Sequence, residues 1–291
     1  MELNQGKLDM QSQVNLRKHI EEVKKRYRLP SPPGVMTKVI SLLKEPNFNA
    51  RELSRVIADD PALAARTLSL SRSPQYGQRR QPRTVDDAVI VLGFQAVRNI
   101  VIATAAQSFL TRKSKISEKI WAHSLAAALT ARLLAKRIHF NDPEMAFLTG
   151  LLHDIGHVLL FNGDPRGYER IIDQVQQSDQ PLYLKEIELY RFDHAAVAFA
   201  LLEHWNIDEQ INEAVVAHHN VGEIRTGSLA SIIDMADYIC GKADLGFYGE
   251  VNPPSEERLG AFDCLDDEAL HGVVLETRGA FDQENLLFRE A

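Results

Sequence analysis

The chain has 291 residues, of which 45% are hydrophobic and 25% charged, with a net charge of −7. These values are typical of a globular protein with its own core. The two cysteines, Cys240 and Cys264, lack CxxC spacing, which argues against a disulfide framework or a thiolate metal site. The polar N-terminus does not read as a signal peptide, and Arg98 and Asn99 interrupt the longest apolar stretch. We therefore expect a cytoplasmic protein without a membrane span.

Charge is unevenly distributed along the chain. Residues 1–118 contain 20 Lys and Arg against 11 Asp and Glu, whereas the remainder is acidic. A basic first part could bind nucleic acid or another polyanion. We favour the alternative that it faces the acidic remainder of the chain or a protein partner. No aromatic residues are interleaved with these basic residues as in a single-strand binder, so nucleic acid is not the expected partner.

The first part of the chain shows helical periodicity and no run of alternating strand residues. Asn49 and Asp60 are suitable N-caps, and Pro61 suits a first helical position. Gly93 divides a long apolar stretch into two helices. The predicted helices cover 14–28, 34–44, 50–58, 61–71, 85–91 and 94–110, with a loop at 72–84 and a basic linker at 111–115.

The second part also shows helical periodicity throughout, so the predicted fold class is all-α. Helices are predicted near 117–138, 143–150, 151–160, 165–178, 181–189, 193–204, 208–219 and 227–243. The acidic tail from residue 250 could form short helices or stay mobile. The expected organisation is a helical N-terminal subdomain (1–115), a helical bundle with a candidate metal site (116–245) and an acidic extension (246–291).

The stretch "LLHDIGH", residues 151–157, concentrates metal-ligating groups in an apolar segment. If it forms one helix, His153 and His157 share a face because they are four residues apart. Asp154 has two carboxylate oxygens and could bridge two metals. Imidazole and carboxylate donors without a thiolate suit Fe, Mn, Zn or Ni.

Further candidate ligands lie on separate helical segments of the same half of the chain. They are His123, His194, His218, His219 and Asp237. Each alone has an ordinary alternative: a histidine on an apolar helix is more often a hydrogen-bonded core residue than a ligand. The conjunction of seven such residues on five segments favours a metal site, present or ancestral.

Taken together, these motifs resemble those of a known family. Residues 116–240 resemble the HD superfamily of metal-dependent phosphohydrolases, whose H…HD…D signature would be His123, His153–Asp154 and Asp237. The earlier stretches "LPSPPGV", "IADDPALAARTLSLSRSPQYG" and "VDDAVIVLGFQAVRNIVIATAA" resemble the HDOD domain, a branch of that superfamily found in bacterial signalling proteins. The resemblance covers roughly residues 20–240.

The resemblance also implies a ligand assignment, because the order of ligands is similar to that in HD-GYP phosphodiesterases, which hydrolyse cyclic di-GMP. One metal would use His123, His153, Asp154 and Asp237, and the other Asp154, His194, His218 and His219. Departures from that pattern argue against activity. His157 replaces a lysine that contacts substrate phosphate, the GYP segment is absent, and Lys119 replaces a glutamate that holds a third metal. Arg72 replaces an asparagine that is common in the HDOD family.

Three functions follow, in order of preference. The first is a regulatory HDOD protein that acts through a protein partner in a signalling pathway, with up to two divalent metal ions retained. The second is a metal-dependent phosphohydrolase acting on a nucleotide such as cyclic di-GMP, with a phosphate ligand at the metal site. In that case Asp154 and His157 would be catalytic, His157 as general acid or phosphate contact. The third is nucleic-acid binding by the basic first part.

Overall fold

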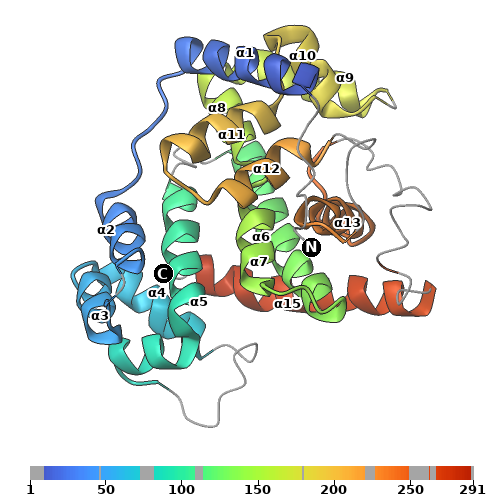
Figure 1. Ribbon diagram of the computed structural model, residues 1–291. Helices are drawn as coiled ribbons and strands as arrows, with labels where there is room; N and C mark the ends of the chain where they lie inside the picture. Colours follow the sequence, from blue (N-terminus) through green and yellow to red (C-terminus); the bar gives the residue numbers. More distant parts are fainter. Residues whose placement is uncertain are drawn as a thin grey trace. The chain divides into compact units, whose positions relative to one another are not determined.

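The computed structural model describes residues 10–45, 47–72, 82–108, 114–178, 180–219, 227–248, 262 and 267–289. These residues form helices and their connections, with no strand among them, so the all-α prediction is confirmed (Figure 1). The chain divides into a larger unit, Met1–Pro30 with Arg112–Arg278, and a smaller unit, Ser31–Thr111 with Gly279–Ala291. This division differs from the expected one, because the N-terminal residues group with the second half of the chain.

The smaller unit is built on α5 (Val85–Ser108), which contacts α2 (Gly34–Leu43), α3 (Ala50–Ala58) and α4 (Pro61–Ser71). Asn49 caps α3 in a reciprocal capping box with Glu52, and Asp60 caps α4 ahead of Pro61, as predicted. The predicted break at Gly93 is also present: its φ of 76° and ψ of 163° interrupt the helix. Only glycine adopts such a conformation readily.

The larger unit holds the remaining helices. They are α1 (Met10–Arg26), α6 (Lys115–Arg137), α7 (Pro143–Leu152), α8 (Ile155–Gly163), α9 (Pro165–Gln176), α10 (Leu182–Tyr190), α11 (His194–His204), α12 (Glu209–Ala217) and α13 (Leu229–Lys242). Helix α6 packs against α7 and α13, and α11 packs against α8 and α12. These contacts bring together the segments that carry the candidate ligands.

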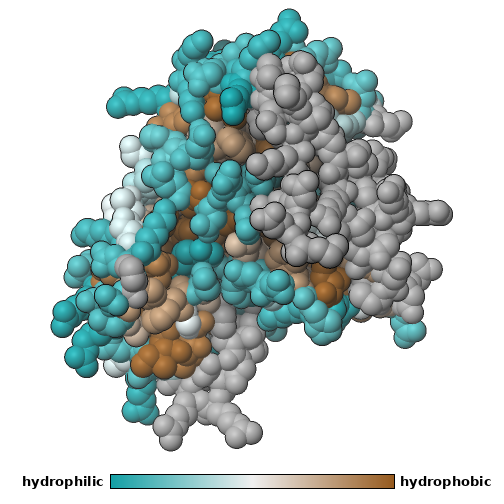
Figure 2. Space-filling view, in the orientation of Figure 1, coloured by the Kyte–Doolittle hydropathy of each residue, from teal (hydrophilic) through white to brown (hydrophobic). Residues whose placement is uncertain are grey.

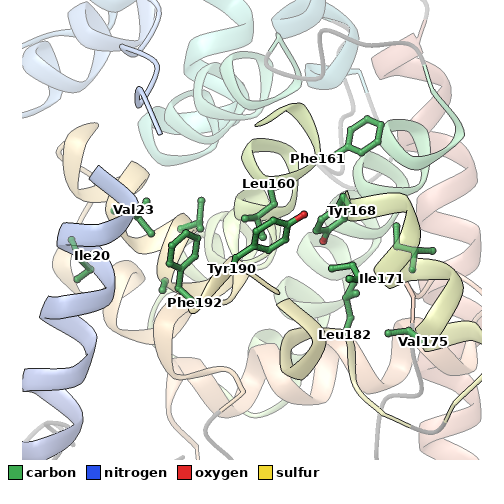
Figure 3. Packing of buried hydrophobic residues seen from close by; sticks show 14 residues of the cluster. Ile20, Val23, Leu160, Phe161, Tyr168, Ile171, Val175, Leu182, Tyr190 and Phe192 are labelled. Atoms are coloured by element: carbon green, nitrogen blue, oxygen red, sulfur yellow. The ribbon is translucent and has the colours of Figure 1, made fainter. Parts of the chain in front are cut away.

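Helix α1 belongs to the larger unit because it packs on α11. Ile20 and Val23 are buried there beside Phe192, as Figure 3 shows. Trp205, at the end of α11, donates a hydrogen bond from Nε1 to the Pro30 carbonyl at 2.9 Å. The basic helix predicted at 14–28 is therefore a structural part of the unit that carries the candidate site.

The described part of the tail contains a long helix, α15 (Asp267–Arg289), where short helices or a mobile segment were expected. Its first half lies against α6 and α13: Val273 is buried, and the Thr277 and Thr130 hydroxyls lie 3.0 Å apart. Arg278 donates to the Ala243 carbonyl at 2.7 Å. The predicted loop 72–84, the linker 111–115 and the start of the tail fall largely outside the described residues.

Two stretches of the described residues are long and apolar enough to cross a membrane by length and composition. These are Val85–Ser108 and Pro143–Gly163, with 56% and 83% of their most apolar windows buried by the rest of the protein. Such burial is typical of core helices. On the face shown in Figure 2 the coloured surface is mostly hydrophilic with separate hydrophobic patches. Single exposed apolar side chains such as Ile90 and Leu275 are ordinary on protein surfaces.

Candidate metal centre

The stretch "LLHDIGH" is a junction between two helices and not part of one helix. His153 is the C-cap of α7, Asp154 precedes α8, and His157 lies in the first turn of α8. His153 and His157 therefore do not share a face of one helix, contrary to the prediction. The helix boundary lies at Asp154 and not at residue 151. The Asp154 carboxylate does not cap α8, although Asp142 and Asp164 cap α7 and α9 with theirs.

Two glycines bring the helices close enough for the histidines to meet. A Cβ on Gly150 would lie 2.7 Å from the Ala127 carbonyl oxygen of α6. A Cβ on Gly156 would lie 2.0 Å from the His194 carbonyl oxygen of α11. Neither position has room for a side chain, so the glycines permit α7 to approach α6 and α8 to approach α11.

Asp154 is the centre of the cluster and is 5% exposed. Its Oδ2 lies 3.2 Å from Nε2 of His123 and 3.5 Å from Nε2 of His157. Its Oδ1 lies 3.2, 3.3 and 3.6 Å from Nε2 of His153, His194 and His218, respectively. One carboxylate therefore faces five imidazole rings.

The first predicted ligand group is assembled as expected. Nε2 of His123 lies 3.3 Å from Nε2 of His153 and 3.1 Å from Oδ1 of Asp237. Both histidines are buried, whereas the Asp237 side chain is 20% exposed. All four predicted residues, His123, His153, Asp154 and Asp237, thus lie around one point.

The second predicted group is also assembled. His194 begins α11, while His218 and His219 follow α12. Nε2 of His194 lies 2.7 Å from Nε2 of His219 and 3.4 Å from Nε2 of His218. Potential ligand atoms of these three histidines lie within 4.8 Å of one another. All seven predicted ligands therefore meet in the larger unit.

Backbone carbonyls fix which nitrogen of several rings faces the cluster. Nδ1 of His123 donates to the Leu245 carbonyl at 3.0 Å, and Nδ1 of His153 donates to the Gly150 carbonyl at 2.8 Å. Nδ1 of His218 donates to the carbonyl of Val215 in the same way. A carbonyl can only accept, so Nδ1 of each ring carries a hydrogen and Nε2 is the nitrogen that faces the cluster.

The inward lone pairs and carboxylate oxygens need a cation among them, because acceptors at 3.1–3.6 Å otherwise repel one another. That cation can be a proton on some rings or a metal ion. Nitrogen and oxygen donors with Nδ1 held by an acceptor are the usual arrangement of metal-binding histidines. The residues present therefore fit divalent metal ions.

Glu186 and Tyr168 also belong to the site, although the sequence analysis missed them. The Glu186 carboxylate is fully buried, and its Oε2 accepts from Nδ1 of His194 at 2.6 Å. Its Oε1 lies 3.0 Å from Nδ1 of His157 and accepts from the Tyr168 hydroxyl at 2.7 Å. A signal was available: Glu186 lies four residues from both Leu182 and Tyr190, on the buried stripe of α10.

The electrostatics of the metal-free site favour positive charge on two rings. Burial lowers the pKa of His123, but contacts with Asp154 and Asp237 outweigh burial and hold that pKa well above its usual value. Burial also opposes the charged form of His194, yet Glu186 and Asp154 raise the pKa of this ring. In the absence of metal, these raised pKa values favour a proton on each of the two rings.

Two other rings are held neutral. Burial lowers the pKa of His153 to about 4. Burial, followed by the charges of His218 and His194, lowers the pKa of His219 well below its usual value. Burial would raise the pKa of Asp154, but the neighbouring histidines hold it well below the ordinary range, so the carboxylate stays ionised. Neutral imidazole and ionised carboxylate are the forms that bind metal.

Comparison with known proteins agrees with this fold. The HDOD domain model matches residues 29–221, so the chain belongs to the HDOD domain family. An HDOD domain protein of unknown function from Geobacter sulfurreducens has a solved structure that is 27% identical. It aligns over 96% of this chain and 94% of its own, with a TM-score of 0.72.

Two further proteins are similar to this chain. A candidate phosphohydrolase from Shewanella amazonensis SB2B is 25% identical over 92% of this chain and 95% of its own, with a TM-score of 0.69. An uncharacterized protein of Treponema pallidum (strain Nichols) is 21% identical over 66% of this chain, and the match spans only 38% of that protein.

Proposed function

We propose that this chain is a regulatory HDOD protein whose core holds up to two divalent metal ions and which acts through a protein partner in a cytoplasmic signalling pathway. The observation that carries the metal proposal is the convergence of inward-pointing Nε2 atoms on the Asp154 carboxylate. The ligands would be His123, His153, Asp154, His194, His218, His219 and Asp237. Fe, Mn, Zn and Ni suit this donor set.

The chain's own residues give the centre a structural role. The ligands come from α6, the α7–α8 junction, α11, the end of α12 and α13, which are separate segments of the larger unit. Binding a metal only in the folded state adds the binding free energy to folding. A bound metal would also supply Lewis acidity. Metal occupancy would therefore determine how rigidly these helices are held together. It would also determine how well ordered their partner-binding surface is.

The test is metal content, measured by mass spectrometry on protein purified without a metal-affinity column. We expect about two metal equivalents in the wild type and a large loss in Asp154→Asn, which keeps the size of the side chain. Asp173→Asn is the matched control, because Asp173 is exposed on α9. Less than half an equivalent in the wild type would remove the metal proposal.

The partner is tested separately from the metal. Affinity capture with wild type and Asp154→Asn, each shown to be folded by circular dichroism, would give the same partner set if the metal is only structural. Loss of a partner from a folded Asp154→Asn protein would show that the partner recognises the metal-bound state. If neither form captures a specific partner, the regulatory proposal loses its support.

The second candidate function is hydrolysis of a nucleotide phosphodiester, and partial exposure of the site favours it. Asp237 is 20% exposed at its side chain, and His219 is only partly buried, so the cluster is partly exposed at these two residues. Cyclic di-GMP is the substrate to assay first, with Mn²⁺, Fe²⁺ or Zn²⁺ added. Turnover that disappears in Asp154→Asn would support an enzyme, whereas no turnover with any of these metals would remove this candidate.

A further inference from the structure

His157 is held in the cluster in the same way as the predicted ligands. Its Nδ1 lies 3.0 Å from Oε1 of Glu186 and also contacts the Tyr168 hydroxyl. That hydroxyl donates its own hydrogen to Glu186 at 2.7 Å. Because the carboxylate can only accept, Nδ1 of His157 carries the hydrogen, and the Nε2 lone pair is left on the opposite side of the ring.

This lone pair faces the cluster and not solvent. Nε2 of His157 lies 3.5 Å from Oδ2 of Asp154, and His157 is only 2% exposed. Its ring lies against that of His194, with centroids 3.7 Å apart and planes inclined by 33°. Potential ligand atoms of Asp154, His157 and His194 all lie within 4.8 Å of one another. A buried lone pair beside a carboxylate oxygen requires a cation between them.

We infer that His157 is an additional metal ligand, binding through Nε2 to the metal that Asp154 and His194 share. The inference rests on the proposed function, since it requires the centre to hold metal. That position would then have five protein ligands: Asp154, His157, His194, His218 and His219. A buried histidine with its Nδ1 hydrogen bound to a carboxylate is a good neutral donor. A charged lysine at 157 would not be one.

His157 as a ligand would change what the centre can do. A catalytic metal site keeps a position open for water or substrate, whereas a structural site is closed by protein ligands. With His157 bound, fewer positions on that metal would be left open to water or substrate. A fifth protein ligand would hold the metal more firmly, which deepens the regulatory proposal at the expense of hydrolysis.

The experiment compares wild type with His157→Ala and His157→Gln, each loaded with Co²⁺. The visible spectrum of Co²⁺ reports the number and type of its ligands, and chelator competition gives the rate of metal loss. His204→Ala is the matched control, because His204 is a histidine at the exposed end of α11, outside the cluster. His157→Gln keeps a polar side chain of similar length. The same spectra and rates of metal loss can therefore be measured on it if His157→Ala does not fold.

We expect an altered Co²⁺ spectrum and at least about 10-fold faster metal loss in both His157 variants, by analogy with loss of a supporting contact to a ligand. Added imidazole should return the His157→Ala spectrum toward that of wild type, because imidazole can fill the vacated volume and supply the nitrogen. Unchanged spectra and metal loss in folded variants would overturn the inference and leave the metal proposal intact. Wild type that binds no Co²⁺ would overturn both.

Discussion

Glu186 holds His194 through two atoms of that residue. Oε2 of the carboxylate lies 2.6 Å from Nδ1 of the ring and 2.8 Å from the backbone nitrogen. The same carboxylate reaches His157 through its other oxygen. One buried anion therefore fixes the first residue of α11 and orients two rings toward Asp154.

Replacing this anion should weaken metal binding without unfolding the protein. Glu186→Gln keeps the shape of the side chain but removes the charge that supports Nδ1–H of both rings. We expect about 10- to 100-fold weaker metal affinity, the usual cost of losing such a supporting carboxylate. Competition with a chromophoric chelator measures this. Glu188→Gln, on the same helix but 70% exposed at its side chain, is the control and should bind as wild type.

The stability of the metal-free protein should pass through a maximum near the ordinary histidine pKa of 6.5. His123 and His194 have raised pKa values, so their stabilisation is complete below 6.5 and is lost as pH rises through the folded-state values. His153, with a pKa of about 4, acts in the opposite direction and costs stability as pH falls from 6.5 toward 4.

Thermal melts in a chelator between pH 4 and 9 measure this dependence. Bound metal should make the melting temperature less dependent on pH above the maximum, because it replaces the protons on His123 and His194. Metal uptake at neutral pH should accordingly release protons, which calorimetry in two buffers of different ionisation enthalpy detects. A metal-free Tm that climbs steadily to pH 9 would contradict the proposed proton occupancy.

Gly156→Ala should separate α8 from α11. The added Cβ would meet the His194 carbonyl oxygen at 2.0 Å, and this oxygen is backbone and cannot rotate away. We expect a loss of about 1–3 kcal/mol in the free energy of unfolding, as for overpacked cores, together with weaker metal binding. Gly272→Ala in α15 has nothing within 4 Å of the new Cβ and should instead be neutral or stabilising. Denaturant titrations of both variants provide the comparison.

The Cys240 thiol should be inert in the folded protein. Burial raises its pKa to about 12, and the side chain is fully buried on α13. A thiol reacts as the thiolate, so alkylation at pH 8 should be negligible until the protein unfolds. Mass spectrometry after iodoacetamide treatment tests this in a Cys264→Ser background, since Cys264 lies outside the described residues. Rapid labelling of native protein would show that α13 opens locally.

Local chemistry explains what the sequence predicted well. A side-chain cap acts over only three residues, so Asn49 and Asp60 correctly predicted the starts of α3 and α4. Gly93 correctly predicted the interruption within α5. The candidate ligands were recognisable because several histidines and aspartates recur on apolar segments, where an isolated polar group is costly.

Long-range contacts explain what the sequence did not predict. Nothing local indicates that α1 packs on α11, or that α15 forms one helix beside Thr130. The helix junction at Asp154 could not be recognised from the sequence, because the apolar residues of α7 and α8 continue on both sides of it. Glu186 was missed because a single glutamate on an amphipathic helix is ordinary until its histidine partners, 8 and 29 residues away, are placed.

Asp154 lies within 3.6 Å of five imidazole rings, so the two proposed metal positions would both depend on that residue. Under the proposed assignment, a substitution at His123 or His219 would remove a ligand from one metal position only. A substitution at Asp154 would remove a donor from both and leave their histidines without a common counter-charge. Loss of function through this residue would therefore be all-or-none, whereas loss through any single histidine would be graded.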